Sequence, residues 1–285
     1  MAKRKWLQVS SILLLSGFLA FGSFQSLTVK AASNTFKVGD KFTISELNTG
    51  DKAYILDYKE ADVTGDTTKD KVILVGSKEF SPEEIFVDNL TVVVQDGKSK
   101  KYSKATYEDF CGYTDDKSLF IGDFTRDNIK DVMVTAATGG SGGFTNHMIA
   151  TFKDNKPNVI FDEKDNEGIQ IEGKYIDGFK AELSIKNMDK KITLDLSAHK
   201  DNYIDSGIYN KSGKLLEEIQ PFMGPFGLLE PQKDYADSGF ILKGSQRIAG
   251  TCNANTISFI DSILKYEDGS WKIKQSQYST YIVKE

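Results

Sequence analysis

The sequence contains few of the residues that build catalytic or disulfide-rich proteins. Its 285 residues include two cysteines, two histidines and five prolines. His147 and His199 are too few for most zinc sites or histidine-based catalytic centres. Cys111 and Cys252 lie 141 residues apart. A disulfide between them is chemically allowed outside the cell, and two separately buried thiols are the alternative.

Long apolar runs are confined to the N-terminus. Lys3–Lys5 is basic, Ile12–Phe24 is apolar, and Val29–Ala31 supplies small residues before Ala32. This order is typical of a secretory signal peptide, which we predict over residues 1–31. The apolar run is shorter than the ~20 residues of a spanning helix. We therefore expect a secreted or cell-wall-associated protein with no membrane span after signal cleavage.

Positive charge is in deficit once that segment is removed. Residues 1–31 carry four basic side chains and no acidic one, so 32 basic residues then face 41 acidic ones, a net charge of −9. Nucleic acids and anionic lipid surfaces require a basic patch, and this balance argues against both as partners. It suits a protein that attracts cations.

Long helical patterns are absent as well. Short runs rich in Val, Ile, Thr, Tyr and Phe alternate with Gly, Asn and Asp turn signals. This pattern predicts an all-β protein. We expect residues 32–285 to form a single all-β repeat domain.

Two acidic loops stand out against this background. Asp62, Asp66 and Asp70 occupy positions one, five and nine of the first loop, with Thr64 at position three. The second loop begins 61 residues later and has the same spacing. Its members are Asp123, Thr125, Asp127 and Asp131. A β-branched run follows each loop, so the pair indicates a repeat.

Carboxylates spaced in this way can surround a hard cation. Calcium takes six to eight oxygens and accepts carboxylates, hydroxyls, carbonyls and water together. The carbonyls of Thr68 and Ile129, at position seven, are expected to add to each set. Position six requires a left-handed backbone, which suits Asn128 better than the β-branched Thr67. We therefore predict calcium in both loops, with the second loop the better site, and disfavour magnesium because it needs a stricter octahedron.

The alternative is that these are Asp-rich turns without an ion. Aspartate side chains readily accept hydrogen bonds from backbone amides two or more residues ahead. Such turns would carry the same residues at the same spacing.

The loops resemble the calcium-binding loops of FG-GAP or VCBS-type repeats, which form the blades of integrin-α-like β-propellers. Positions one, five and nine match that family's aspartates, whereas threonine replaces the acidic residue at position three. The resemblance implies a β-propeller-like array of antiparallel sheets with about four blades, and a β-sandwich is the alternative architecture. It covers the clear repeat units at about 55–107 and 118–162. Residues 165–235 form a degenerate region, and residues 236–285 form a C-terminal β unit.

These features favour a secreted, calcium-binding, non-enzymatic binding or scaffolding protein of the bacterial cell surface. The ions would stabilise the repeat loops at ~10⁻⁴–10⁻³ M affinity. Its further partner would be an extracellular protein or carbohydrate that the sequence does not identify. The alternative is a secreted polysaccharide-acting hydrolase on the same fold, because the many carboxylates allow an acid/base pair.

Overall fold

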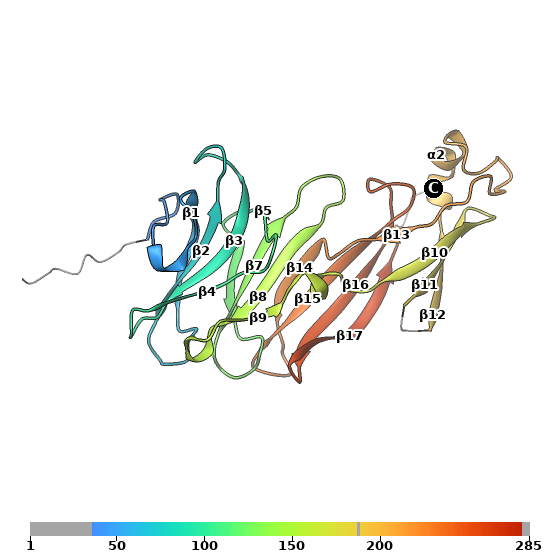
Figure 1. Ribbon diagram of the computed structural model, residues 1–285. Coiled ribbons are helices and arrows are strands. Elements are labelled where there is room, and N and C mark those ends of the chain that lie inside the picture. The colour runs from blue at the N-terminus through green and yellow to red at the C-terminus, as the bar shows by residue number, and fades with distance from the viewer. Residues whose placement is uncertain (1–35, 187–188, 281–285) are drawn as a thin grey trace, which may run out of the picture. The chain divides into compact units, whose positions relative to one another are not determined.

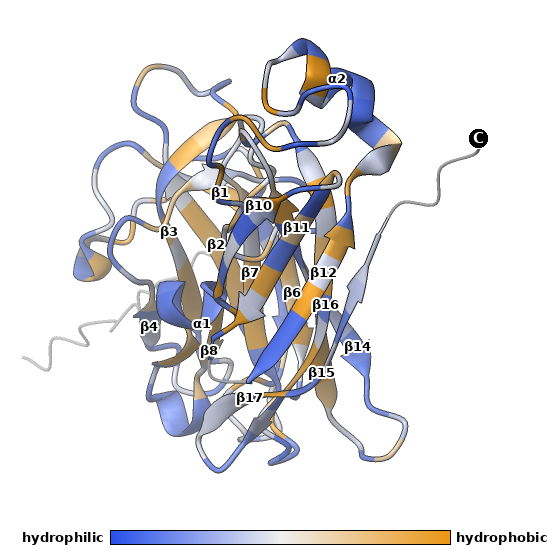
Figure 2. Cartoon of the chain, turned by 90° about the vertical axis from the view of Figure 1, so that its right-hand side faces the viewer, coloured by the Kyte–Doolittle hydropathy of each residue, from blue (hydrophilic) through white to orange (hydrophobic). Residues whose placement is uncertain are grey.

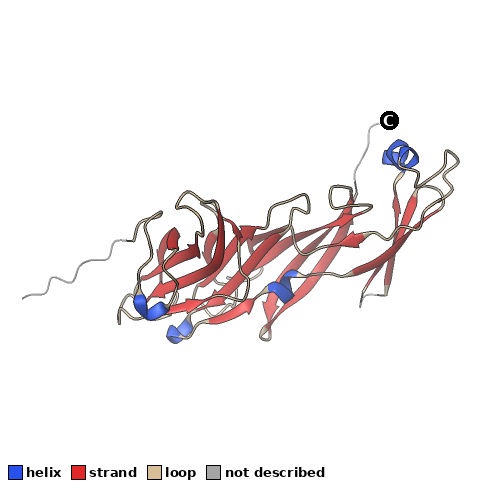
Figure 3. Ribbon diagram, turned by 45° about the horizontal axis from the view of Figure 1, so that its top comes forward, coloured by secondary structure: helices blue, strands red, loops and turns tan. Residues whose placement is uncertain are grey.

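The computed structural model describes residues 36–186 and 189–280. The predicted signal peptide, residues 1–31, lies outside these residues. Strands account for 48% and helices for 7% of the chain, so the all-β prediction is confirmed. In the described part no helix is long and apolar enough to cross a membrane. The helical segments are short turns between strands (Figure 3), namely η1 (Ser45–Leu47), η2 (Lys153–Asn155), α1 (Glu163–Asn166), η3 (Ser197–His199) and α2 (Lys200–Asp205).

The N-terminal half forms one antiparallel sheet of nine strands, curled into a half-barrel (Figure 1). Its order is β1-β2-β3-β5-β7-β8-β9, with β4 paired to β3 and β6 paired to β7. The strands are β1 (Ala53–Ala61), β2 (Asp70–Ser77), β3 (Phe86–Gln95), β4 (Tyr102–Ala105), β5 (Gly112–Tyr113), β6 (Leu119–Gly122), β7 (Asp131–Ala137), β8 (Thr145–Thr151) and β9 (Asn158–Phe161).

The central strands of this sheet are buried on both faces. On β2, Val72 and Leu74 face one apolar cluster while Ile73 and Val75 face another, with Phe42. Successive side chains of a strand point to opposite faces, so a strand covered on both sides needs an unbroken apolar run. This explains the continuous β-branched runs that follow the two acidic loops.

The C-terminal half contains two further antiparallel sheets, one of three strands and one of five. The first is β10-β11-β12, and the second is β13-β15-β16-β17 with β14 also paired to β15. Their strands are β10 (Ile171–Ile176), β11 (Lys180–Ile185), β12 (Lys190–Asp195), β13 (Phe222–Met223), β14 (Leu228–Lys233), β15 (Phe240–Ala249), β16 (Thr256–Glu267) and β17 (Ser270–Ser279).

These two sheets pack face to face (Figure 2). Ala181, Leu183 and Leu194 of the three-stranded sheet share one buried apolar cluster with Ile248 and Ile260 of the five-stranded sheet. This arrangement is a small β-sandwich, in which each strand turns one face inward and the other to solvent. The β-sandwich alternative for the whole domain stays a prediction.

The described sheets do not correspond to four separate propeller blades. β3 pairs with β5 and β5 pairs with β7, so the two predicted repeat units join edge to edge in a single sheet. Propeller blades are instead separate four-stranded sheets arranged around an axis. The difference comes from the short strand β5, which bridges the two units.

The disulfide that the sequence allows between Cys111 and Cys252 is not formed in the structure. Cys111 is half-buried, Cys252 is exposed, and both are free thiols. Cys111 directly precedes β5 of the nine-stranded sheet, whereas Cys252 lies in the turn between β15 and β16.

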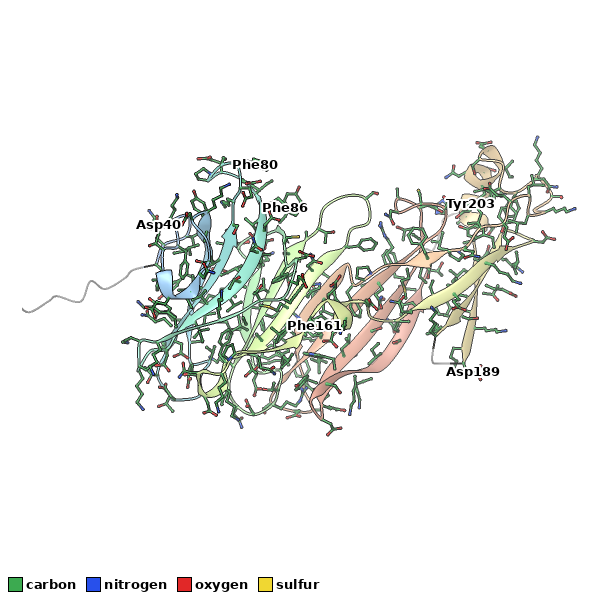
Figure 4. All side chains as sticks on the ribbon, in the orientation of Figure 1. Asp40, Phe80, Phe86, Phe161, Asp189 and Tyr203 are labelled. Atoms are coloured by element: carbon green, nitrogen blue, oxygen red, sulfur yellow. The ribbon has the colours of Figure 1, made fainter. Side chains whose placement is uncertain are left out.

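An aromatic cluster joins the nine-stranded sheet to the five-stranded sheet. Phe124 and Phe161 contact Trp271 edge to face, with ring centroids 5.9 Å and 5.6 Å apart. The indole Nε1–H of Trp271 donates to the backbone carbonyl of Ile160 at 2.8 Å. Phe161 projects from the end of β9 toward the C-terminal sheets (Figure 4). The two halves therefore share one core at this position.

Replacing Trp271 tests that shared core. We expect Trp271→Ala to lower the free energy of unfolding by about 3 kcal/mol, because a packed indole and its hydrogen bond are lost. Tyr235→Ala is the control, since that side chain is 94% exposed, and it should change stability by less than about 0.5 kcal/mol. Urea unfolding followed by far-UV circular dichroism measures both. Equal effects of the two substitutions would contradict the shared core.

Candidate functional site

The two acidic loops connect paired strands within the nine-stranded sheet. The first leads from β1 into β2, and the second leads from β6 into β7. Each is therefore the turn of an antiparallel hairpin. The aspartate at position nine, Asp70 or Asp131, is the first residue of the second strand and is completely buried.

Each loop is closed by hydrogen bonds from its own backbone to its own carboxylates. The aspartate at position one accepts from the N–H groups at positions four and six, and that at position five accepts from position seven. The aspartate at position nine accepts from positions two and three through Oδ2. The N···O distances lie between 2.6 and 3.0 Å, and the bonds are Gly65 and Thr67 to Asp62, Thr68 to Asp66, Val63 and Thr64 to Asp70, Arg126 and Asn128 to Asp123, Ile129 to Asp127, and Phe124 and Thr125 to Asp131.

The two loops share the same backbone conformation as well as the same hydrogen bonds. Position six is left-handed in both, as predicted, with φ of 71° at Thr67 and 68° at Asn128. Position four is also left-handed, with φ of 84° at Gly65 and 63° at Arg126. A β-branched residue at positive φ is strained, so the carboxylate of Asp62 must compensate for holding Thr67 there. The loops are one structural motif present twice.

The ninth position is where the two copies differ. Oδ1 of Asp70 accepts from the backbone N–H of Gly97 at 2.8 Å. Oδ1 of Asp131 is buried and has no hydrogen-bond partner, and the Thr125 hydroxyl is likewise buried without one. Burial raises the pKa of Asp131 to about 6, against the opposing effect of the Thr125 and Phe124 amides. The second loop therefore retains two buried oxygens, whereas the first retains only the Thr64 hydroxyl.

The two loops lie side by side. A side chain added at Gly65 would meet the end of the Ile129 side chain at 2.5 Å, so the two loops are in close contact at this point. The backbone N–H of Asp154, in the β8–β9 turn, donates to the Thr64 carbonyl at 3.0 Å. The turn of the second repeat unit is thus anchored on the loop of the first.

The second loop also contacts the five-stranded sheet. The guanidinium of Arg126 pairs with Asp234 at 3.1 Å and with Asp237 at 3.0 Å, both in the turn between β14 and β15. The backbone N–H of Phe240 donates to the Asp123 carbonyl at 2.7 Å. Arg126 occupies the left-handed position that glycine fills in the first loop, and from there its side chain reaches the other sheet. This loop is therefore a joint between the two halves.

The carboxylates do not converge as they would around a bound ion. Within residues 36–186 and 189–280, no three acidic, histidine or cysteine side chains are grouped to hold a metal. In the first loop both oxygens of Asp62 and of Asp70 accept amide hydrogen bonds. In the second loop Asp127 accepts from the Lys153 ammonium at 2.9 Å, which lowers its pKa although burial opposes the shift. In this loop Oδ1 of Asp131 and the Thr125 hydroxyl are buried without a hydrogen-bond partner and could accept a cation.

His147 is a buried polar group that the loops do not use. It lies on β8, is 0% exposed, and its Nδ1 is 3.0 Å from the Thr135 hydroxyl. Burial lowers its pKa to about 3, so the ring is neutral at pH 7. A fully buried imidazole cannot exchange protons with a substrate, and we assign His147 to the core.

A large polar cleft among the described residues has no counterpart in the sequence motifs. It has a volume of about 810 Å³ and is lined by polar groups between the η1–β1 loop and the segment after β4. Its acidic side chains are Asp51, Glu79, Glu108 and Asp109. All four are exposed, and Glu79 pairs with Lys52 at 2.6 Å. A glycosidase acid needs a desolvated carboxyl, and this cleft does not provide one.

Comparison with known proteins finds a family match in the C-terminal half of the chain. The model of the YybI C-terminal domain matches residues 169–279, which contain the three-stranded and five-stranded sheets. The uncharacterized protein YybI of Bacillus subtilis (strain 168) is 31% identical over 206 residues, covering 72% of this chain and 77% of that protein. No solved structure matches the chain.

Because hydrogen bonds close the two loops, we predict that the loops stabilise the folded protein without a bound ion. In EDTA, Asp62→Ala and Asp123→Ala should each lower the free energy of unfolding by about 1–2 kcal/mol, because two backbone amides lose their acceptor. Asp116→Ala is the control, since this exposed turn residue has no such role, and it should stay within about 0.5 kcal/mol. Loop substitutions without effect in EDTA would contradict the assignment.

The raised pKa of Asp131 predicts the direction in which folding stability changes with pH. Its folded pKa of about 6 exceeds the unfolded value of ~3.9. As pH falls, the folded state therefore binds a proton before the unfolded state does. This group contributes about 2 kcal/mol of stability at pH 4, and the protein loses this contribution as pH rises through 6.

The Asp131→Asn variant lacks this titration. Its free energy of unfolding relative to wild type should rise by about 2 kcal/mol between pH 4 and pH 7. Urea unfolding in EDTA at a series of pH values measures the difference. A difference that does not change with pH would show that Asp131 is not desolvated in the folded state.

Proposed function

The chain belongs to the YybI family, and we propose that it is an exported, non-enzymatic binding or scaffolding protein. Export is supported by the basic and apolar residues at the N-terminus. A non-catalytic role is supported by the exposed carboxylates of the large cleft and by the complete burial of His147. The FG-GAP-type resemblance, and with it any relation to propeller blades, stays a prediction.

The proposal rests on the structural role of the loop aspartates. Their oxygens accept backbone amides and fix turns, so the most acidic motif of the chain has a structural role. A catalytic carboxylate must instead face the substrate with a free oxygen. The loops hold adjacent hairpins in register and connect the second hairpin to the five-stranded sheet. Such an arrangement supports a rigid surface for binding.

A screen on cell-wall and plant polysaccharides separates this proposal from the hydrolase alternative. We expect no turnover by the exported form, whether or not binding to an immobilised polysaccharide is detected. Sustained turnover that Glu108→Gln or Asp109→Asn abolishes would establish the hydrolase and overturn the proposal.

We also propose that the second loop binds calcium. The unpartnered Oδ1 of Asp131 and the hydroxyl of Thr125 favour it. The carboxylates of Asp123 and Asp127, which are not gathered around one point in the structure, would have to turn toward the ion to complete the ligand set with the Ile129 carbonyl. Because the loop amides already hold the turn, the ion would add stability to a formed loop. In the first loop the matched Oδ1, on Asp70, already accepts the Gly97 amide, so we place the ion in the second loop.

Melting with calcium and with EDTA tests this property. Millimolar calcium should raise the midpoint of the wild type, because a ligand bound only by the folded state stabilises it. Asp131→Asn should abolish the rise, whereas Asp70→Asn, at the matched position of the first loop, should retain it. A midpoint that calcium does not move, or a rise lost equally in both variants, would contradict calcium binding at the second loop.

A further inference from the structure

An apolar slot opens between the two sheets of the C-terminal sandwich. It has a volume of about 380 Å³ and lies where β12 and β17, the edge strands of their sheets, face each other. Its apolar lining comes from Ile185, Ile192, Ile260, Ile273 and Tyr278. The slot lies within the segment that matches the YybI C-terminal domain.

The slot is open to solvent along one side. Ile260 at its floor is 1% exposed, while Tyr278 at its mouth is 51% exposed. In register, Ile260 is opposite Tyr278 and Leu264 is opposite Ile273, so the apolar side chains of β17 continue the inner face of the sandwich. The three-stranded sheet covers this face only in part (Figure 2). Apolar surface at such an edge gains free energy when a ligand covers it.

Three lysines line the same slot, on a chain whose net charge is negative. They are Lys190 and Lys191 on β12 and Lys274 on β17. Lys274 pairs with Glu267 at 2.9 Å. Lys190 and Lys191 are exposed, and no carboxylate in the described ranges forms an ion pair with them, including exposed Asp189 beside them (Figure 4). An apolar slot with cationic groups at its mouth is complementary to a ligand with an apolar tail and an anionic head.

We propose that this slot binds a single-chain anionic amphiphile, such as a fatty acid, with the tail along Ile192, Ile260 and Ile273. The carboxylate would lie at the mouth beside Lys190 and Lys191. Pockets of this size and lining are common for small ligands, in which a few polar groups fix the orientation. This inference does not depend on the aspartate loops or on calcium.

Titration with saturated fatty acids below their micelle-forming concentrations tests the slot, using the full chain after removal of residues 1–31. Binding should be one to one, and affinity should rise about fourfold for each added methylene from octanoate to dodecanoate. Dodecanol, which lacks the charge, should bind at least about tenfold more weakly than dodecanoate. Equal binding of the alcohol, or affinity independent of chain length, would overturn the proposal.

Lysine substitutions locate the head group. Lys190→Gln/Lys191→Gln should weaken dodecanoate binding about tenfold. The matched control is Lys174→Gln/Lys180→Gln, which removes the same charge from exposed positions of the same sheet outside the slot, and it should leave affinity unchanged. Equal loss in both pairs would overturn the assigned site. Binding to vesicles of anionic phospholipid without binding of monomeric dodecanoate would show a membrane surface as the ligand and would also overturn it.

Discussion

The structure depends on how the two acidic loops satisfy their backbone amides. A tight hairpin turn leaves several N–H groups without partners in the ladder, and a buried amide without a partner costs about 1–3 kcal/mol. Here the carboxylates at positions one, five and nine accept these amides, five bonds in each loop. The strands that follow enter the core immediately, because Asp70 and Asp131 are themselves their first residues. The loops thus fix where the buried apolar runs begin.

The two copies of the loop make different contacts with the rest of the protein. The first loop has glycine at position four and packs against the second loop at that point. The second loop has Arg126 there, in a strained left-handed backbone, and its guanidinium pairs with Asp234 and Asp237 of the five-stranded sheet. The ion pairs and the hydrogen bond from Phe240 hold one repeat against the C-terminal half. The aromatic contacts of Trp271 reinforce the same junction.

Local chemistry could be predicted from the sequence further than long-range arrangement could. The spacing of the aspartates located both loops, and the need for a left-handed residue identified Thr67 and Asn128. The Asx-type hydrogen bonds were one of the two interpretations that the residues allowed. The bond from Gly97 to Asp70 could not be predicted, because it joins turns 27 residues apart. No such bond reaches Oδ1 of Asp131, and the joining of the two repeats through β5 depends on tertiary pairing of two residues. The slot between β12 and β17 likewise arises only when two sheets pack.

The central claim is that the loop amides are held by the loop carboxylates without an ion. Native-state hydrogen exchange in EDTA tests it most directly, read at the amides of Val63, Thr64, Phe124 and Thr125. The account predicts that these four amides exchange slowly, with protection comparable to that of neighbouring residues in β2 and β7, and that calcium changes this little. Fast exchange in EDTA that becomes slow on addition of calcium would contradict it, because the ion would then be forming the loops.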